Sequence, residues 1–210
     1  MPTPEDYKTA RALAIEKLTK ADLADCCSKA GVSLEQDSEG NRRISIPFLG
    51  KACYLVVGVN KTAFDESIEA VRLQDQVLLL HYLITASGSA IQNKWITFRE
   101  VPSGPFYYPS FVKRAIVPLV KCFGSHPEGL EKVGNQIGAL MSEPGDVAVR
   151  VLALPRVPVV LSLWKGDDEF TPEGNVYFDA SVACYLDTED IAYLAGSVVY
   201  ATIGVYRSMA

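Results

Sequence analysis

His81 is one of only two histidines in the chain, and it lies in a long apolar stretch that we expect to be helical. On a helix, its neighbours three and four positions away would be Val77, Leu78, Ile84 and Thr85, so the imidazole would project from a largely apolar face. A neutral imidazole beside an apolar slot is what an axial ligand to the metal of a haem or corrinoid requires. The alternative is a core histidine whose ring is hydrogen-bonded to a carbonyl group.

Aromatic residues are concentrated in the middle of the chain and could form such a slot. They are Trp95, Phe98, Phe106, Tyr107, Tyr108, Phe111 and Trp164. Arg99 and Arg114 lie near them in the sequence, and each could bind a ligand carboxylate through two parallel hydrogen bonds. Core packing would also explain the aromatic residues, and Glu100 or acids further downstream could pair with the arginines instead.

A second candidate group is acidic, because Asp167, Asp168 and Glu169 follow directly on a predicted strand. Their carboxylates could bind a divalent cation, or one of them could act as a general base if its pKa were raised. The alternative is a solvated turn. For the acids between positions 187 and 190, the alternative is the N-terminus of a helix, where the helix dipole favours negative charge.

The sequence contains none of the common catalytic motifs, such as GxSxG, GxxxxGK[ST], HExxH or GxGxxG, and therefore predicts no reaction. Its five cysteines are an odd number and form no CxxC pair. A disulfide framework of the secreted kind is therefore not expected. A zinc or iron–sulfur site built from this chain alone would need an unusual ligand spacing.

The elements that position these residues are predicted to be helices mixed with short strand pairs. Helices are expected over residues 4–31, 67–87, 110–123 and 128–141 and from Asp187 onward, and strands over 43–48, 52–57, 95–98, 147–154, 157–164 and 175–179. Pro158 should confine its strand to an edge, a bulge or the first strand position. This order has no regular βαβ rhythm, which indicates an α+β fold with a mainly antiparallel sheet, packed with a central apolar helix and flanking helices.

Length, charge and hydropathy narrow the class of protein. A chain of 210 residues fits a single globular domain over residues 1–210. A net charge of -5 argues against binding to nucleic acid. The longest apolar runs fall far short of the ~20 residues that a membrane span needs. The N-terminal residues do not resemble a signal peptide, so we expect a cytoplasmic protein with no membrane span.

Four segments in sequence order resemble a family of anaerobic bacteria and archaea catalogued as domain of unknown function 3786. They are LLLHYLITASG, WITFREVPSGPFYYPSF, LPRVPVVLSLWKGDDEF and VYFDASVACYL. Relatives often occur with iron–sulfur cluster segments, and the family is associated with one-carbon and corrinoid metabolism, so the resemblance implies a redox or tetrapyrrole connection. The chain lacks the N-terminal CxxCxxC run of the fused relatives, so any cluster would belong to an iron–sulfur partner. The motif positions are His81, Tyr82, Trp95, Phe98, Arg99, Glu100, Trp164, Gly166, Asp167, Glu169, Phe170 and Asp179.

We therefore predict a protein that binds haem or a corrinoid, with His81 as the metal ligand and a small-molecule cofactor as its main partner. The predicted cofactor-binding residues are His81, Tyr82, Trp95, Phe98, Arg99, Tyr107, Tyr108 and Trp164. One alternative is a divalent-cation-dependent enzyme that uses the turn Asp167-Asp168-Glu169. The other is a non-catalytic interaction module for an iron–sulfur or corrinoid protein.

Overall fold

The chain forms two compact units, each with an antiparallel sheet of its own, in a computed structural model that describes residues 3–58, 61–67, 70–141 and 143–209. Unit 1 comprises Met1–Ala90, Leu154–Arg156 and Cys184–Leu186, and unit 2 comprises Ile91–Ala153, Val157–Ala183 and Asp187–Ala210. The predicted α+β fold with antiparallel strands is confirmed, with the strands divided between two sheets. The expectation that the chain folds as one domain stays a prediction.

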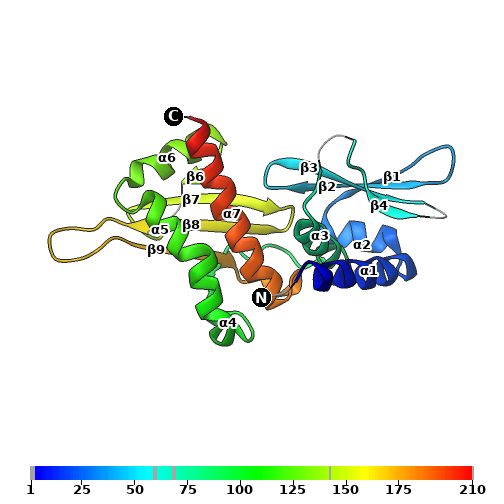
Figure 1. Cartoon of the computed structure of the whole chain (residues 1–210), viewed down its shortest axis with the longest axis horizontal. Helices are drawn as coiled ribbons and strands as arrows, with labels where there is room; N and C mark the ends of the chain where they lie inside the picture. Colours follow the sequence, from blue (N-terminus) through cyan, green and yellow to red (C-terminus); the bar gives the residue numbers. More distant parts are fainter. Residues whose placement is uncertain (1–2, 59–60, 68–69, 142, 210) are drawn as a thin grey trace. The chain divides into compact units, whose positions relative to one another are not determined.

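Unit 1 combines helices with a sheet of strand order β1-β2-β3-β4 (Figure 1). Its elements are α1 (Pro4–Lys20), α2 (Leu23–Ala30), β1 (Ser33–Gln36), β2 (Arg42–Phe48), β3 (Lys51–Val57), β4 (Thr62–Phe64) and α3 (Leu73–Thr85). The predicted hairpin is formed by β2 and β3, and both residues of its turn, Leu49 and Gly50, have positive φ. Alternate residues of these strands, among them Ile44, Ile46 and Leu55, are fully buried and form part of the core.

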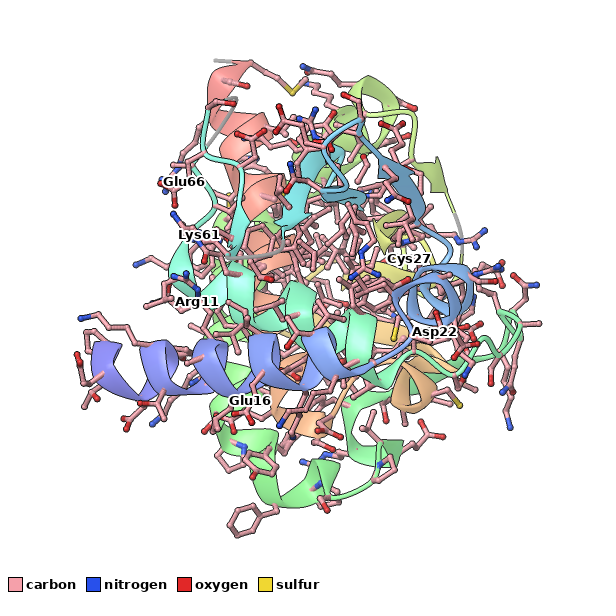
Figure 2. The ribbon with its side chains drawn as sticks, turned by 90° about the vertical axis from the view of Figure 1, so that its right-hand side faces the viewer. Arg11, Glu16, Asp22, Cys27, Lys61 and Glu66 are labelled. Carbon is pink, nitrogen blue, oxygen red and sulfur yellow. The ribbon has the colours of Figure 1, made fainter. Side chains whose placement is uncertain are left out.

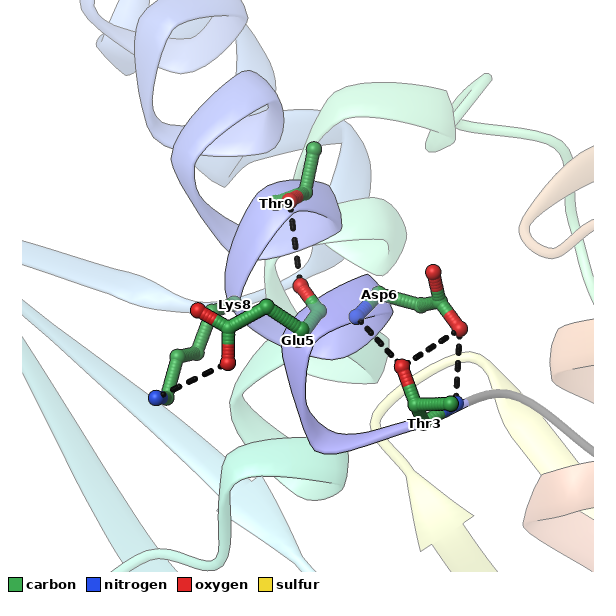
Figure 3. A network of polar contacts seen from close by, with 5 residues as sticks. All are labelled: Thr3, Glu5, Asp6, Lys8 and Thr9. Atoms are coloured by element: carbon green, nitrogen blue, oxygen red, sulfur yellow. Dashed lines mark hydrogen bonds and ion pairs between the residues drawn. The ribbon is translucent and has the colours of Figure 1, made fainter.

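The first predicted helix is divided into α1 and α2. A capping box starts α1, because the amide of Thr3 donates to the Asp6 carboxylate at 2.6 Å and the amide of Asp6 donates to the Thr3 hydroxyl at 3.3 Å (Figure 3). The chain leaves the helix at Ala21, and Asp22, which is labelled in Figure 2, is the N-cap of α2. Its carboxylate accepts from the amide of Ala24 at 2.9 Å. The apolar stripe continues through the break, which is why periodicity alone predicts one helix.

The predicted central helix, α3, begins later than expected. Ser67 is not its N-cap, because the amide and hydroxyl of Ser67 both donate to the carboxylate of Asp65 in a turn after β4. Residues 68 and 69 lie outside the described part, and α3 starts at Leu73 with Arg72 as the N-cap. It packs against α1, and residues 75–83 are all buried except the half-buried His81.

Unit 2 has a sheet of strand order β5-β9-β8-β7-β6, crossed on one face by α5 and α7 (Figure 1). Its main elements are β5 (Trp95–Thr97), α4 (Gly104–Phe111), α5 (Val117–Phe123), α6 (Pro127–Gln136), β6 (Leu140–Met141), β7 (Val147–Leu154), β8 (Val157–Trp164), β9 (Glu173–Asp179) and α7 (Thr188–Ser208). The bounds of β7 and β8 are those predicted. Among the described helices, none is both long and apolar enough to span a bilayer.

Several boundaries in unit 2 differ from the prediction, and β9 begins at Glu173, two residues before the predicted start. Helical structure begins at Gly104 and continues through a π-helical turn at Val112–Ile116 into α5. Pro118, two residues after that turn, lacks the amide that would donate to the preceding turn of the helix. The predicted helix over 128–141 ends at Gln136, followed by Gly138 with a φ of 66° and then by β6. The predicted strand over 95–98 stops before Phe98, which starts a 3-10 turn.

The strand that contains Pro158 is an interior strand, contrary to the preference for an edge. β8 lies between β7 and β9. The paired residues of β8 and β9 begin with Val159 opposite Phe178, so Pro158 precedes that ladder and its missing amide donor costs no hydrogen bond to β9.

Candidate functional site

A short turn between β5 and α4 fixes the position of Arg99. Thr97 caps the 3-10 turn Phe98–Glu100, and its amide and hydroxyl both donate to one carboxylate oxygen of Glu100, at 2.7 and 2.9 Å. These hydrogen bonds hold the pKa of Glu100 below its ordinary value, because they stabilise the charged form. The carboxylate is thus used inside the turn, while the side chain of Arg99 is exposed.

The backbone that leads into α4 is tightly constrained. Ser103 has a φ of 59°, in the left-handed region that non-glycine residues rarely adopt. A Cβ atom on Gly104 would lie 1.9 Å from the carbonyl oxygen of Phe98, so only glycine fits. The hydroxyl of Thr188, at the start of α7, donates to the carbonyl oxygen of Pro102. Backbone strain of this kind is retained where the surroundings over-determine the conformation, often at functional sites.

Beneath the turn, aromatic rings form a packed core. Phe98 stacks on Phe111 with ring centres 4.3 Å apart and an interplanar angle of 3°, and Phe178 contacts both rings at 6.3 and 6.2 Å. All three side chains are fully buried. Phe98 therefore lies within the predicted aromatic cluster, in its interior rather than at its surface.

Next to that core, two pairs of contacting side chains, Arg99 with Tyr108 and Phe106 with Tyr107, make up what we call the α4 surface. The guanidinium carbon of Arg99 lies 3.7 Å from the ring centre of Tyr108. Phe106 meets Tyr107 edge to face with ring centres 5.2 Å apart, and Phe106 is 82% exposed. Tyr108 contacts the buried Phe111 at 5.9 Å, so the α4 surface rests directly on the aromatic core. It can bind flat apolar and anionic groups.

Trp95 and Trp164, also predicted for the site, lie at opposite ends of the second sheet. Trp95 of β5 pairs with Asp179, at one end of β9, whereas Trp164 of β8 pairs with Glu173, at the other end of β9. Six positions along a strand correspond to roughly 20 Å. Trp95 lies under the guanidinium of Arg150, at 5.7 Å. The structure thus brings together most of the predicted aromatic residues of unit 2 but separates Trp164 from Trp95.

His81 and Tyr82 belong to unit 1. The hydroxyl of Tyr82 donates to the carbonyl oxygen of Ala30 at 2.6 Å and accepts from the amide of Arg156 at 3.2 Å. Burial raises the pKa of Tyr82, whose side chain is fully enclosed. His81 is half-buried, whereas every other residue from 75 to 83 is buried. Of these two residues, only His81 presents surface to an incoming ligand.

The acidic turn borders a separate hollow of about 570 Å³ in unit 2. Its lining includes Glu128, Lys165 and all three acids of the predicted cation site, Asp167, Asp168 and Glu169. One oxygen of Asp167 accepts from the amides of Glu169 and Phe170, each at 2.8 Å, and these bonds lower its pKa. Within the described ranges, no three His, Cys, Asp or Glu side chains are grouped so that they could hold a metal ion.

Asp179 is not part of the acidic turn, because it lies at the other end of β9. One of its oxygens accepts from the amide of Gln92 at 3.0 Å and from the hydroxyl of Ser181 at 2.6 Å. Burial favours the neutral acid, but these bonds outweigh it and the pKa of Asp179 is lowered. Its second oxygen is buried and finds no hydrogen-bond partner among the described residues.

The predicted set of cofactor-binding residues contains neither Phe106, which enters the prediction only as one of the aromatic residues in the middle of the chain, nor Arg150. In the sequence Phe106 is one aromatic residue among several, but its exposure follows from the turn PSGP in front of it, which offers a usable signal. Arg150 interrupts the apolar strand VAVRVLAL, and a lone arginine in such a strand indicates a specific partner, which is the ring of Trp95.

Comparison with models of protein families matches residues 22–201 of the 210-residue chain to the model described as Domain of unknown function (DUF3786). The resemblance seen in the sequence is thereby confirmed. Comparisons with curated proteins and with solved structures give no match.

Proposed function

The chain belongs to the family described as a domain of unknown function (DUF3786), a description that gives no activity, and we propose from the site itself that it binds a tetrapyrrole at the α4 surface. The observation that carries this proposal is that the side chain of Phe106, beside Tyr107, is 82% exposed. The other phenylalanines of unit 2 are fully buried, except Phe170 in the acidic turn. An exposed aromatic side chain in the first turn of α4, close behind the strained residue Ser103, is available for a flat ligand.

The chemistry of the α4 surface suits a macrocycle such as haem or a corrinoid. Aromatic rings gain apolar burial and stacking energy from a flat conjugated ring, and the guanidinium of Arg99 can bind an anionic side chain of the ligand. Phe98 supports the surface from below, through the chain of contacts from Phe98 to Phe111 and on to Tyr108. We expect its effect on the ligand to be indirect.

The predicted axial ligand, His81, belongs to α3 of unit 1 and is not one of the residues of the α4 surface, so its role is a separate proposal with a test of its own. The half-buried position of His81 among buried neighbours supports it, because an imidazole must be accessible on one side and shielded from bulk water on the other. A bound tetrapyrrole would supply redox or one-carbon chemistry at its metal. The residues of this chain would supply binding, orientation and one ring nitrogen.

The test is titration of the purified protein with haemin and with hydroxocobalamin, followed by visible absorbance. We expect saturable binding of at least one of them. The variants Phe106→Ser and Tyr107→Ser should weaken it about tenfold, because an aromatic contact contributes on the order of 1 kcal/mol beyond its buried area. Phe170→Ser is the matched control, since Phe170 is also 69% exposed but lies in the acidic turn. Absence of saturable binding of both ligands would reject the proposal.

The role of His81 is tested separately, because the chain has one other histidine. In the haemin complex, His81→Ala should shift the Soret band and change the spin state of the iron. His126→Ala should leave the spectrum unchanged, since His126 is exposed and pairs with Glu128 at 3.2 Å. If both variants give the wild-type haemin spectrum, His81 is not the axial ligand. The proposal that the α4 surface binds the macrocycle would not be affected.

The second candidate is the cation-dependent enzyme, with the hollow at the acidic turn as its site, although no three acids among the described residues are grouped as metal ligands. The walls of the hollow carry four carboxylates, from Glu128, Asp167, Asp168 and Glu169, against one amine, from Lys165. Calorimetric titration with Mg²⁺, Mn²⁺ and Ca²⁺ tests it, with Asp168→Asn as the variant. Saturable heat that disappears in the variant would support the candidate, and absence of heat with all three ions would reject it.

A further inference from the structure

Arg99 has a charge that the described chain does not neutralise. Its neighbour Glu100 is the obvious partner, but the Glu100 carboxylate accepts from both the amide and the hydroxyl of Thr97. Among the described residues, no carboxylate lies within ion-pair distance of Arg99, and its guanidinium contacts the ring of Tyr108. Because the Glu100 carboxylate is hydrogen-bonded to Thr97 in the capping box of the turn, it forms no ion pair with the neighbouring guanidinium of Arg99.

Two other arginines of the chain do have a carboxylate partner. Arg43 pairs with Asp65 at 3.2 Å, and Arg72 pairs with Asp75 at 2.7 Å. Arg43 also lies over an aromatic ring, that of Tyr54, at 4.1 Å, so Arg99 differs from it in having no carboxylate partner among the described residues. Stacking on Tyr108 restricts the plane of the Arg99 guanidinium while its N–H donors at the edge stay available. A guanidinium held in this way loses little conformational entropy when it binds a carboxylate.

We infer that Arg99 binds a carboxylate of the ligand, and that the α4 surface selects tetrapyrroles with free carboxylates over those with neutral side chains. This inference rests on the proposed function and narrows its ligand class. Haem carries two propionate groups, whereas the peripheral side chains of cobalamin are amides, so the site should prefer haem-type porphyrins. An amide can accept a hydrogen bond from a guanidinium but brings no opposite charge, and charge-assisted bonds are roughly twice as strong.

The experiment compares haemin, haemin dimethyl ester and cyanocobalamin, all titrated in the same detergent-containing buffer. The wild-type protein should bind haemin about tenfold or more tighter than the ester, because one hydrogen bond between charged groups is equivalent to about that factor in Kd. Arg99→Ala should lower haemin affinity to the level of the ester without changing ester affinity. Arg99→Lys should fall between them, because the ammonium keeps the charge but not the two-pronged geometry.

The matched control is Arg207→Ala, which removes an exposed arginine from the last turn of α7 in the same unit. It should leave the preference for haemin over the ester intact, and thermal melting should show that every variant is folded. Equal wild-type affinity for haemin and its ester would overturn the inference while the proposed function stands. If Arg99→Ala weakens the binding of haemin and of its dimethyl ester equally, the inference is also wrong, because the arginine would then only hold the aromatic side chains of the α4 surface in position. Failure of all three ligands to bind would instead reject the proposed function.

Discussion

The hydroxyl of Tyr82 donates a hydrogen bond of 2.6 Å to the carbonyl oxygen of Ala30, the last residue of α2. The same hydroxyl oxygen accepts from the amide of Arg156 at 3.2 Å, and the ring of Tyr82 lies 5.9 Å from that of Tyr185. One fully buried side chain therefore joins α3 to α2 and to two short segments that return to unit 1 from much later in the sequence. Tyr82 has the contacts of a structural residue.

Replacing Tyr82 by Phe should destabilise the protein by about 1–3 kcal/mol, because it leaves a buried carbonyl and a partly buried amide without their partner. The measurement is urea unfolding followed by circular dichroism. Tyr200→Phe is the control, since Tyr200 is 61% exposed, and it should have little effect. If Tyr82→Phe leaves the stability unchanged but abolishes haemin binding, this prediction is wrong and Tyr82 contacts the ligand.

Asp179 should make folding stability depend on pH. Its pKa in the folded protein is lowered, so its contribution is fully present above the unfolded value of about 4 and is lost as the pH falls through the folded pKa. We expect Asp179→Asn to cost about 1–3 kcal/mol at pH 6, because the hydrogen bonds from Gln92 and Ser181 lose their charged acceptor.

The pH dependence is isolated by measuring wild type and Asp179→Asn together at pH 6, 5, 4 and 3. The difference in unfolding free energy should narrow as the pH falls, since the two side chains become alike once Asp179 is protonated. Glu100→Gln serves as a comparison, because Glu100 also accepts two bonds but is exposed at the surface. A difference that stays constant from pH 6 to pH 3 would show that Asp179 does not titrate in this range.

The elements that the sequence predicted well are those in which local pattern and tertiary structure agree. The β2–β3 hairpin has alternating side chains around a two-residue turn, and β7 and β8 are dense in β-branched residues. The errors occur where a local side-chain bond overrides periodicity. Asp22 starts a new helix within an unbroken apolar stripe, and Asp65 binds Ser67 in a turn before α3 can begin.

The candidate site could be predicted only in part, because its contacts depend on pairing across the chain. The stacking of Arg99 on Tyr108 connects residues nine positions apart and follows from one turn, so the sequence is enough to indicate this segment. The separation of Trp95 from Trp164 depends on their register against β9, which composition does not reveal. The burial of Asp179 depends on the loop that contains Gln92, 87 residues away.

Cys27 should be among the least reactive thiols of the chain. Burial, together with the neighbouring thiol of Cys26, raises the pKa of Cys27 to about 11. At pH 8 only about one such thiol in a thousand is the reactive thiolate. Alkylation with iodoacetamide, mapped by mass spectrometry, should therefore modify Cys27 in urea but hardly in buffer. Equally fast labelling in both conditions would contradict this and would make Cys27 available as a metal ligand.

Gly104 should be the most sensitive position next to the α4 surface. In Gly104→Ala the new methyl group would lie 1.9 Å from the carbonyl oxygen of Phe98, so the backbone between the 3-10 turn and α4 must move. We expect a loss of about 2–4 kcal/mol in unfolding free energy, the range of a severe steric change at a buried backbone site. Because Tyr108 lies on α4 and Arg99 on the turn, haemin affinity should fall as well.

Gly204→Ala is the matched control for this substitution. Gly204 lies on the exposed side of α7, and no atom of the described residues outside its own stretch of helix lies within 4 Å of the position that a Cβ would occupy. Alanine there should raise stability by about 1 kcal/mol through its higher helix propensity. The two glycine variants should thus change the urea midpoint in opposite directions, and only Gly104→Ala should weaken the binding of haemin. A Gly104→Ala protein with full stability and full affinity would show that the turn tolerates a side chain, and the α4 surface would then lack the rigid support on which its proposed role depends.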